Sequence, residues 1–572
     1  MHTTRRDLMK FVAGSAVGAL FTPAPWRLIT DTALWSENWP GIPRPAHGEI
    51  KTKFTNCALC PAGCAVRARC VGEQPVSLAG VPAHPLSHGA LCPFGLAGHH
   101  LPYHPERLRQ GDPQAAVSAV TDAAARCGAN ERIAVLDLSP GRTASWTYRR
   151  AMAGVKNGLY LTSGPNWAVD LTKARTVISF GVPVLDGWGT PGNVLRAREN
   201  FRLVQVEPLE SHTAALADEW LNLQPDAQAA LAIVKERAAG EPALVLGDDP
   251  QILALNQVTG AWGKLIVPRQ DAPVPASWKK AVPSEDLASV PDASIRILLI
   301  DESAAGDYIP WNAIEKKLVR DNPVVVTFAW SRAGYGRHAQ FVLPTAVYPE
   351  MTGDIPPAID SPAAAFRLST PLLAPPAGVV NPSDFIARLA GLDAANALRE
   401  RAGAIHASRR GMLFTYADGK STPVKEIKPD DFWKELNEGA CWLGDPAPAG
   451  QVGNLRPMVD RPGSEPTVSD ALPLTVALTE THSAPLVSPL LSKLYQESNL
   501  RLGRNCAALH PDSARMAGVE DGARAVLETG LGRCAIQVTL DPSIPPGIVQ
   551  VAAGAEVLDI CGAFARARVV RA

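Results

Sequence analysis

The sequence of 572 residues has little charge and no long hydrophobic run. Charged residues make up 19% of it, the formal net charge is −1, and no Lys/Arg run stands out beyond the N-terminus. These features do not favour a nucleic-acid partner. No apolar stretch reaches the length of roughly 18 residues that a transmembrane helix needs, so the sequence shows no obvious membrane span.

Several familiar catalytic motifs are also missing. The sequence contains no G-x-G-x-x-G that opens a helix, no G-x4-G-K-[ST], no G-x-S-x-G and no H-E-x-x-H. These absences exclude the usual nucleotide-binding, serine-hydrolase and metalloprotease interpretations. Ten cysteines in 572 residues are too few for a disulfide-dense scaffold.

The composition is otherwise that of a folded globular protein. Apolar residues make up 46% of the chain, and its length requires several domains. The 51 prolines predict long irregular connections between regular elements.

Four cysteines crowd into a short part of the chain and carry the clearest chemical signal. Cys57, Cys60, Cys64 and Cys92 are spaced Cys-x2-Cys-x3-Cys-x27-Cys. Three thiolates on one tight loop and a fourth from a distant turn suit a [4Fe–4S] cluster. We therefore predict these four residues as cluster ligands. Such a cluster carries single electrons, which predicts electron transfer.

Zinc, disulfides and covalent haem are the alternative uses of these cysteines. A structural zinc site also takes four thiolates, although zinc sites favour paired Cys-x2-Cys knuckles over a loop with three cysteines. The first three cysteines are too closely spaced to pair comfortably with each other as disulfides. Covalent haem is disfavoured because Pro61, and not a histidine, follows Cys60.

The N-terminus has the pattern of a twin-arginine export signal, which we assign to residues 1–30. Arg5 and Arg6 precede a weakly apolar segment from Phe11 to Phe21, which is too short to cross a bilayer. An amphipathic N-terminal helix is the alternative. Twin-arginine export moves folded proteins, so a cluster inserted in the cytoplasm could travel with the chain. We expect a periplasmic location, at the extracytoplasmic face of the membrane.

Residues 45–112 should form a small β-rich domain around the cluster. The segment from Ala65 to Ala79 predicts a hairpin that turns at Gly72, with Cys70 as a buried thiol. The cysteine spacing, this hairpin and three short motifs resemble the N-terminal cluster domain of the molybdopterin oxidoreductase superfamily; the motifs are His84-Pro85, Gly89-x-Leu91-Cys92-x2-Gly95 and Tyr103-x-Pro105-x-Arg107-Leu108. That superfamily includes formate dehydrogenases, periplasmic nitrate reductases and polysulfide reductases. Family enzymes commonly have a lysine where this chain has Phe94. The loss of that positive charge should lower the cluster potential somewhat.

Residues 113–470 predict an α/β region with doubly wound parallel sheets. Short apolar runs alternate with candidate helices at Asp122 to Arg126 and Ala227 to Ala239. The runs are Ile133 to Leu136, Thr176 to Phe180, Phe201 to Val206, Ala243 to Leu246, Ile295 to Ile300 and Pro323 to Phe328.

Parts of this region resemble the same superfamily. The segment Val206-Glu207-Pro208 and its continuation look like the strand, loop and helix near the pterin-dinucleotide site. Phe341 to Pro344, with Glu350 and Gly353, resembles another recurrent segment, in which Gln340 replaces a frequent acidic residue.

The expected molybdenum ligand has no clear counterpart. Family enzymes carry a Cys, selenocysteine, Ser or Asp ligand on a long loop, whereas Leu138 to Arg175 is short and contains no cysteine. Ser163 is the one candidate that we name, and a turn serine is the alternative interpretation. The resemblance therefore predicts the family fold without molybdenum catalysis. Molybdopterin guanine dinucleotide is kept as a doubtful cofactor.

The C-terminal part should begin with an irregular stretch. Residues 363–473 are rich in Pro, Gly and Ala and predict peripheral insertions and a linker, with a helix near residues 382–399. Residues 471–572 then predict strands and turns that resemble the dinucleotide-binding, double-psi-type β-barrel of the superfamily. Asn505 and His510 could face a pterin dinucleotide or serve turns. The remaining strand cysteines are expected to be core thiols, namely Cys506, Cys534 and Cys561.

The resemblance as a whole implies an exported iron–sulfur subunit of a membrane-associated respiratory complex. Similar subunits occur in alternative complex III and in the periplasmic menaquinone reductase complex. The implied partners are a ferredoxin-like iron–sulfur subunit, a multihaem cytochrome and a quinone-interacting membrane subunit. The alternatives are an active molybdenum or tungsten bis-pterin oxidoreductase acting on formate, nitrate or a sulfur compound, and a structural subunit with zinc or an empty site.

Overall fold

The computed structural model describes most of the chain after residue 47. The described residues are Met9, 48–162, 164–225, 227–238, 242–304, 309–446, 473–478, 506–551, 555–562 and 564–572. Apart from Met9, the predicted export signal lies outside them, and so do Ser163 and Asn505. Within the described part of the chain, no helix has the length and apolarity that a membrane crossing would require.

The N-terminal domain is a three-stranded antiparallel sheet in the order β1-β2-β3. Its strands are β1 (Ile50–Asn56), β2 (Ala65–Val71) and β3 (Gln74–Gly80). The predicted hairpin is confirmed, because β2 and β3 pair on either side of the turn at Gly72. Short helices α3 (Pro93–Ala97) and η1 (Gly98–Tyr103) follow. Cys70 is fully buried on β2, as expected of a core thiol.

A six-stranded parallel sheet forms the first half of the α/β region, in the order β12-β5-β4-β13-β14-β15. Its strands are β4 (Arg132–Asp137), β5 (Gly158–Thr162), β12 (Ser284–Glu285), β13 (Ile295–Asp301), β14 (Val324–Ala329) and β15 (Phe341–Pro344). Alternate residues of β4 enter separate cores on the two faces. Helices α4 (Pro113–Ala125), α5 (Thr143–Gly154) and α11 (Pro382–Leu389) cover one face, and α10 (Trp311–Glu315) covers the other. The predicted doubly wound architecture is confirmed.

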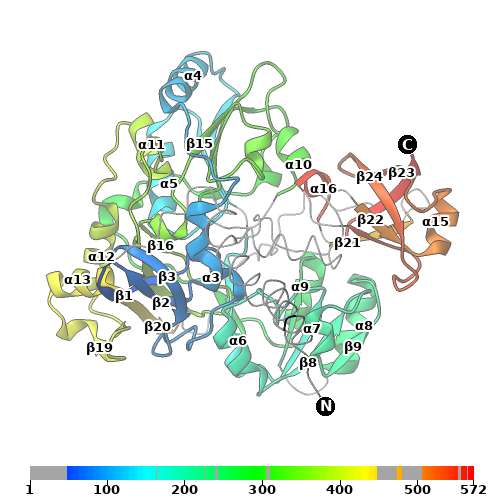
Figure 1. The fold of residues 1–572 in the computed structure, drawn as a ribbon, viewed down its shortest axis with the longest axis horizontal. Coiled ribbons are helices and arrows are strands. Elements are labelled where there is room, and N and C mark those ends of the chain that lie inside the picture. Colours follow the sequence, from blue (N-terminus) through cyan, green and yellow to red (C-terminus); the bar gives the residue numbers. More distant parts are fainter. Residues whose placement is uncertain are drawn as a thin grey trace.

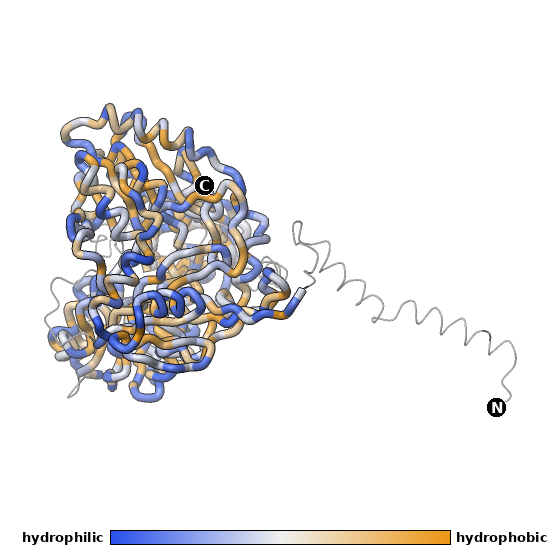
Figure 2. The backbone as a smooth tube through the Cα atoms, turned by 90° about the vertical axis from the view of Figure 1, so that its left-hand side faces the viewer, coloured by the Kyte–Doolittle hydropathy of each residue, from blue (hydrophilic) through white to orange (hydrophobic). Residues whose placement is uncertain are grey.

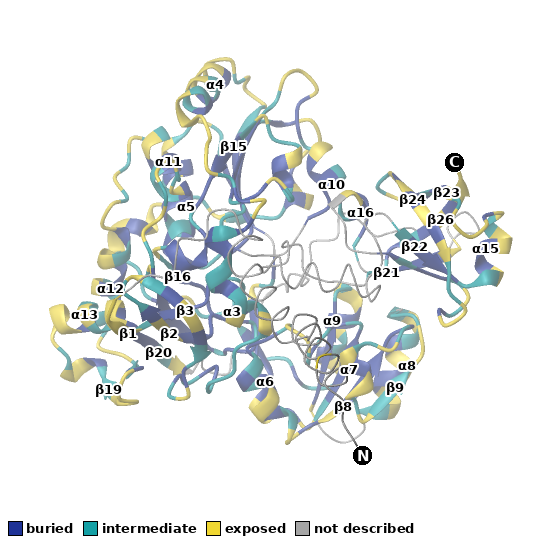
Figure 3. Ribbon diagram, in the orientation of Figure 1, coloured by how far each residue is buried: buried dark blue, intermediate teal, exposed yellow. Residues whose placement is uncertain are grey.

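A second parallel sheet has the order β10-β7-β8-β9. Its strands are β7 (Thr176–Phe180), β8 (Arg202–Val206), β9 (Glu219–Leu221) and β10 (Ala243–Gly247), with a small ribbon of β6 (Trp167–Val169) and β11 (Ile266–Pro268). The helices of this part are α6 (Pro191–Arg198), α7 (His212–Ala215), α8 (Ala227–Arg237) and α9 (Pro250–Val258). The buried faces of α8 and α9 pack against the sheet while their outer faces are exposed, as Figure 3 shows.

The stretch expected to be irregular supplies four strands of a five-stranded antiparallel sheet, so that expectation is wrong for residues 363–446. The sheet order is β16-β17-β20-β18-β19. Its elements are β16 (Gly353–Ile355), β17 (Ala363–Ser369), β18 (Met412–Thr415), β19 (Ser421–Pro423) and β20 (Ala440–Pro446), with helices α12 (Ala397–Ala407) and α13 (Pro429–Gly439). All seven residues of β17 are buried, so the alternating pattern that marks a strand is absent. This sheet lies beside the N-terminal domain (Figure 1).

The C-terminal domain is a closed six-stranded barrel, in agreement with the predicted barrel. Its strands are β21 (Leu474–Leu478), β22 (Cys506–Leu509), β23 (Arg524–Thr529), β24 (Arg533–Leu540), β25 (Ile548–Val551) and β26 (Arg566–Arg571), with helices α15 (Pro511–Ala517) and α16 (Ala555–Leu558). Cys534 and Cys561 are buried in the barrel core, whereas Cys506 is half-buried. Asp559 accepts hydrogen bonds from Arg337 at 3.0 Å and ties the barrel to the first α/β half.

Hydrophobic segments run through the interior of the domains and hydrophilic segments through many of the outer loops (Figure 2). Short 3-10 helices complete the connections: η2 (Leu171–Lys173), η3 (Ala276–Lys279), η4 (Leu287–Ser289), η5 (Tyr335–Arg337), η6 (Tyr348–Glu350) and η7 (Val424–Glu426).

Candidate iron–sulfur centre

The first three cysteines lie on the connection between β1 and β2. Cys57 directly follows β1 and Cys64 directly precedes β2, so the strand pairing fixes both ends of the loop. The Cys57 N–H donates to the Cys64 carbonyl at 2.9 Å, and the Gly63 N–H donates to the Cys60 carbonyl at 3.2 Å. Gly63 has a φ of +55°, which an L side chain rarely adopts. A closed turn therefore presents all three thiols.

The fourth cysteine comes from the start of α3. Cys92 is the N-cap of this helix, and its sulfur accepts a hydrogen bond from the Gly95 N–H at 3.4 Å. Gly95 is packed closely against Leu91, because a Cβ added there would lie 2.5 Å from Leu91 Cδ1, and it lies near the loop, since the same Cβ would be 3.7 Å from Cys57 Sγ. The start of α3 therefore places Cys92 beside the loop that carries the other three cysteines.

Backbone amides point at the sulfur atoms of the loop. The Leu59 N–H donates to the Cys57 sulfur, and the N–H groups of Ala62 and Gly63 donate to the Cys60 sulfur. These hydrogen bonds stabilise a thiolate over a thiol. Hydrogen bonds to cluster sulfurs are also one of the means by which proteins set cluster potentials.

Burial opposes ionisation of the same thiols. With burial as the largest cause, the pKa of Cys57 is raised well above its usual value, that of Cys60 to about 11 and that of Cys64 to about 12. The neighbouring cysteines contribute to these increases, because several thiolates in one buried place repel each other. Four thiolates can therefore coexist here only with a compensating positive charge, which the iron ions of a cluster would supply.

The placement of the cysteines follows the pattern that favours a cluster over zinc, because three of them lie on one loop and not in two paired knuckles. Among the described residues, no group of three or more His, Cys, Asp and Glu side chains is placed to hold a metal ion.

A five-stranded sheet distant in sequence supports the loop from behind. Asn56, which precedes Cys57, donates to the Leu368 carbonyl at 2.8 Å and accepts from the Tyr416 hydroxyl at 2.7 Å. Thr55 exchanges hydrogen bonds with the backbone of Thr370 at 2.8 and 2.9 Å. Arg367 of β17 reaches the loop itself. No pattern in the sequence indicates this support.

A buried ion pair holds the other side of the domain. Arg107 contacts both carboxylate oxygens of Glu350 at 2.6 and 2.5 Å, and both side chains are almost completely buried. Tyr348 of the same short helix packs in the core that contains Cys57. Arg107 and Glu350 belong to separate family-like segments of the sequence, and the fold brings them together.

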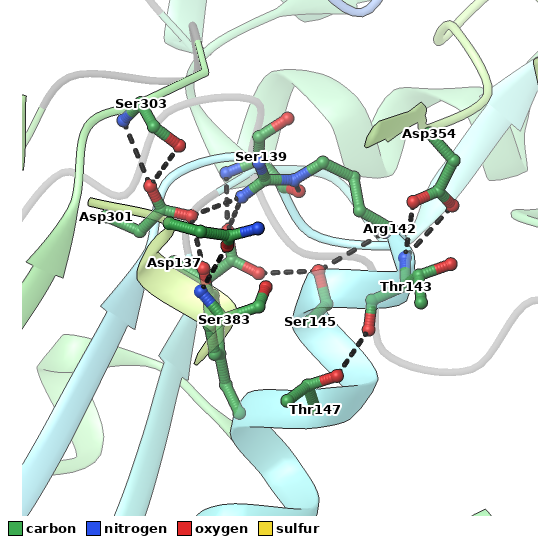
Figure 4. A network of polar contacts seen from close by, with 12 residues as sticks. Asp137, Ser139, Arg142, Thr143, Ser145, Thr147, Asp301, Ser303, Asp354 and Ser383 are labelled. Carbon is green, nitrogen blue, oxygen red and sulfur yellow. Dashed lines mark hydrogen bonds and ion pairs between the residues drawn. The ribbon is translucent and has the colours of Figure 1, made fainter. Parts of the chain in front are cut away.

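A second polar cluster occupies the carboxyl edge of the six-stranded sheet (Figure 4). Arg142 donates to Asp137 and Asp301 at 2.8 Å each and to the Ser139 carbonyl at 2.8 Å. Asp137 also accepts from the Tyr160 hydroxyl at 2.8 Å, and Asp301 from the Tyr148 hydroxyl at 2.7 Å. We call these five residues the Arg142 network: Asp137, Arg142, Tyr148, Tyr160 and Asp301.

The single guanidinium of the Arg142 network is paired with two carboxyl groups of the protein. Burial acts to raise the pKa of Asp301, but the charge of Arg142 and the hydrogen bonds from Ser303 and Tyr148 together outweigh it, so the pKa is lowered. The two carboxylates raise the pKa of Arg142 well above its usual value, although burial alone would lower it. Parallel sheets commonly bind ligands at this edge. Here two carboxylates and a backbone carbonyl of the protein already accept hydrogen bonds from the guanidinium.

A small cavity separates the Arg142 network from the cysteine loop. Its volume is about 10 Å³, and Cys60, Ser139, Arg142 and Asp354 are among the residues that line it. A space of this size is suited to about one water molecule. Asp354 is itself engaged, because it accepts hydrogen bonds from the Thr143 N–H and from Arg401.

The other residues singled out in the sequence make packing contacts or hydrogen bonds within the fold. Phe94 is half-buried and packs against the core around Cys57. Gln340 accepts a hydrogen bond from the Val325 N–H at 2.6 Å and thus joins neighbouring strands. His510 is the N-cap of α15 and accepts from the Asp512 N–H at 3.1 Å. Glu207 accepts a hydrogen bond from Gln205 at 3.1 Å.

Comparison with known families identifies the cysteine-bearing domain. The family model described as the molybdopterin oxidoreductase Fe4S4 domain matches residues 50–104, which contain all four cysteines. Over these residues the chain is similar to the molybdopterin oxidoreductases. This Fe4S4 domain supports the predicted [4Fe–4S] cluster.

Two relatives extend the similarity beyond the Fe4S4 domain. The menaquinone reductase, molybdopterin-binding-like subunit of Nitratidesulfovibrio vulgaris is 27% identical over 277 residues, which are 41% of this chain and 39% of that protein. A sulfite dehydrogenase subunit from Allochromatium vinosum is 25% identical over 234 residues, which are 33% of this chain and 24% of that protein. Both matches span well under half of the relatives' own length.

A solved structure shows that the fold is shared more widely. Acetylene hydratase from Pelobacter acetylenicus superposes with a TM-score of 0.59, covering 87% of this chain and 92% of its own, at 13% sequence identity. At this identity, the match establishes the fold alone. The described N-terminal domain, parallel sheets and terminal barrel therefore share the fold of that structure.

Proposed function

We propose that this chain is an exported iron–sulfur electron-transfer subunit of a membrane-associated respiratory oxidoreductase complex. Cys57, Cys60, Cys64 and Cys92 hold one [4Fe–4S] cluster, which takes up and releases a single electron when it is bound. The observation that carries the proposal is the convergence of four buried or half-buried thiols with three backbone N–H donors on one glycine-containing loop.

We further propose that the chain does not perform molybdenum catalysis. The Arg142 network supports this, because the arginine at the ligand-binding edge of the main sheet is neutralised by two aspartates of the protein. The region that should carry a molybdenum ligand, between Leu138 and Arg175, also contains no cysteine. The chain then acts as a redox subunit rather than as the catalytic centre.

The proposed setting follows from the relatives and the N-terminal sequence. A similar protein is named as a subunit of menaquinone reductase, which favours electron exchange with a quinone-linked complex. The partners would be a ferredoxin-like iron–sulfur subunit, a multihaem cytochrome and a membrane subunit that interacts with quinone. The paired arginines at positions 5 and 6 favour twin-arginine export to the periplasmic face of the membrane.

Metal analysis and fractionation test these proposals together. The full chain should be expressed with its own N-terminus and purified anaerobically from the periplasmic and membrane fractions. We expect iron, acid-labile sulfide and an EPR signal after reduction, without stoichiometric molybdenum or tungsten. Replacing both arginines of the pair by lysine should retain the protein in the cytoplasm while leaving its iron content unchanged. Stoichiometric molybdenum would refute the proposed lack of molybdenum catalysis.

An active molybdenum or tungsten bis-pterin oxidoreductase is the second candidate. It is favoured by the shared fold over 87% of the chain and by the relative that is named as part of a sulfite dehydrogenase. Extraction of a pterin dinucleotide from the purified protein would support it. Stoichiometric zinc without iron would favour a purely structural role over both redox candidates.

A further inference from the structure

Arg367 is a completely buried arginine that binds the cysteine loop from β17. Its guanidinium donates hydrogen bonds to three backbone carbonyls of the cysteine loop and to one that directly follows β16. The acceptors are Ala62 at 2.7 Å, Gly63 at 3.2 Å, Pro61 at 3.2 Å and Pro356 at 2.6 Å. Three of these four carbonyls lie between Cys60 and Cys64, so the guanidinium holds the turn that presents both thiols.

The guanidinium lies directly against this turn. A Cβ added to Gly63 would be 2.5 Å from the Arg367 Cζ and 2.6 Å from its Nη1. The positive charge of Arg367 acts on the nearby thiols, since it favours the ionised forms of Cys60 and Cys64. Arg367 is therefore close enough to influence the charge state of two predicted ligands.

No acidic side chain neutralises this arginine among the described residues. All four of its described hydrogen bonds go to carbonyl groups, none of the ion pairs found in the described residues includes it, and its Nε has no hydrogen-bond partner there. The other buried arginines, Arg107, Arg142 and Arg401, each pair with a carboxylate. A buried guanidinium without a counter-ion is costly, so a negative charge at the loop would stabilise it.

We propose that Arg367 is the positioning residue that sets the electron affinity of the cluster. The inference rests on the proposed function, because it requires the cluster to be bound by the four cysteines. A cluster with four thiolate ligands is negatively charged and gains one further negative charge when a partner subunit donates an electron. The positive charge of Arg367 stabilises the reduced state more than the oxidised state.

This role changes the expectation based on Phe94. The absence of a lysine at that position predicts a lower potential, whereas β17 supplies a cation that contacts the loop directly. Burial makes the charge of Arg367 more effective than that of an exposed residue, because solvent screens it less. The effect of Phe94 on the potential is therefore offset by a residue from another domain.

The test is an EPR-monitored redox titration of the full-length, anaerobically purified protein. Arg367→Gln should decrease the equilibrium constant for one-electron reduction at least tenfold, which is a decrease of about 59 mV. Arg367→Lys keeps the charge and should remain within threefold of the wild type. Arg69→Gln removes an exposed cation of β2 in the same domain and should leave the equilibrium constant within twofold.

A second variant covers the case in which Arg367→Gln fails to hold iron. Cys441 lies opposite Arg367 in the pairing of β17 and β20, and the arginine charge lowers the Cys441 pKa against the larger effect of burial. Cys441→Asp therefore places a carboxylate beside the guanidinium while retaining the loop hydrogen bonds. It should also decrease the equilibrium constant at least tenfold, whereas Cys441→Ser should not.

The outcomes separate the two proposals. An iron-loaded Arg367→Gln or Cys441→Asp protein that titrates within twofold of the wild type would overturn the role of Arg367 and leave the proposed function intact. Wild-type protein without iron would instead refute the proposed function.

Discussion

Removing Arg142 should destabilise the six-stranded sheet strongly and in a manner that depends on pH. In Arg142→Met, Asp137 and Asp301 lose the cation that both contact at 2.8 Å. Their charges lie within roughly 6 Å of each other, which at an effective dielectric constant of about 20 is about 3 kcal/mol of repulsion. Removing one partner of a buried ion pair generally costs about 3–5 kcal/mol. We therefore expect Arg142→Met to lower the free energy of unfolding by an amount in that range at neutral pH.

The sign of the pH dependence follows from the pKa of Asp301. In the wild type this pKa is below its usual value, so its contribution to stability is present above the unfolded-state pKa and is lost as the pH falls through the folded-state value. In Arg142→Met, repulsion and burial should raise the folded-state pKa of one aspartate above its unfolded value. The variant should therefore gain stability on acidification, and the difference between the two proteins should shrink.

Hydrogen–deuterium exchange of the amides in β4 and β13 is the appropriate assay, because a protein with several domains need not unfold in one step. Exchange at pH 7.5 and 5 should show a large loss of protection in Arg142→Met that is smaller at the lower pH. The double variant Arg142→Met/Asp301→Asn should recover part of the lost protection, because it removes the repulsion between the two aspartates. The recovery should be partial, because Asp137 still lacks its cationic partner. A decrease of less than about 1 kcal/mol in the free energy of exchange at pH 7.5 would refute the predicted role of Arg142 in stability.

Three further predictions concern the cluster loop and the barrel. Cys60→Ser should abolish stoichiometric iron binding, whereas Cys70→Ser, in the same domain, should retain iron; equal iron contents would contradict the ligand assignment. Gly63→Ala should release iron, because the added Cβ would collide with the buried Arg367 guanidinium at a residue whose φ is +55°. Gly72→Ala is the matched control, because its φ is +59° but the space around it is open. It should lower domain stability by only about 1–2 kcal/mol and keep the iron. Asp559→Asn removes the ion pairs with Arg337 and His338 at the end of η5 and should increase hydrogen exchange at this contact between the barrel and the α/β region. The barrel strand β23 is the internal control. Unchanged exchange at Arg337 and His338 would show that the contact does not depend on the charge of Asp559.

Local patterns in the sequence are sufficient to predict the cysteine-bearing domain. Three of its cysteines lie on one hairpin connection, and the fourth caps a helix that begins one residue later. Six strands of the parallel sheets are predictable for the same reason, since β4, β7, β8, β10, β13 and β14 are short, mostly apolar and mostly buried runs. The short edge strands β9 and β12 carry no such run and are not predicted. Hydrophobic periodicity therefore positions the predicted ligands and most of the surrounding sheets.

The residues that support the site cannot be found in this way. Arg367 is 305 residues from its acceptor Ala62, and it lies in an alanine-rich strand without an alternating pattern. Asp137 and Asp301 meet because β4 and β13 are neighbours in the sheet, although 159 residues separate Arg142 from Asp301. Such pairs depend on strand order and on the docking of distant sheets, which local periodicity does not specify.

The most direct test of the account is the metal and sulfide content of the anaerobically purified full-length protein, measured together with its EPR spectrum after reduction. The account predicts about four iron and four sulfide per chain, as a [4Fe–4S] cluster requires, and a signal that disappears on reoxidation. Protein with no iron, with one zinc per chain, or with Cys57, Cys60, Cys64 and Cys92 joined in disulfides would contradict it.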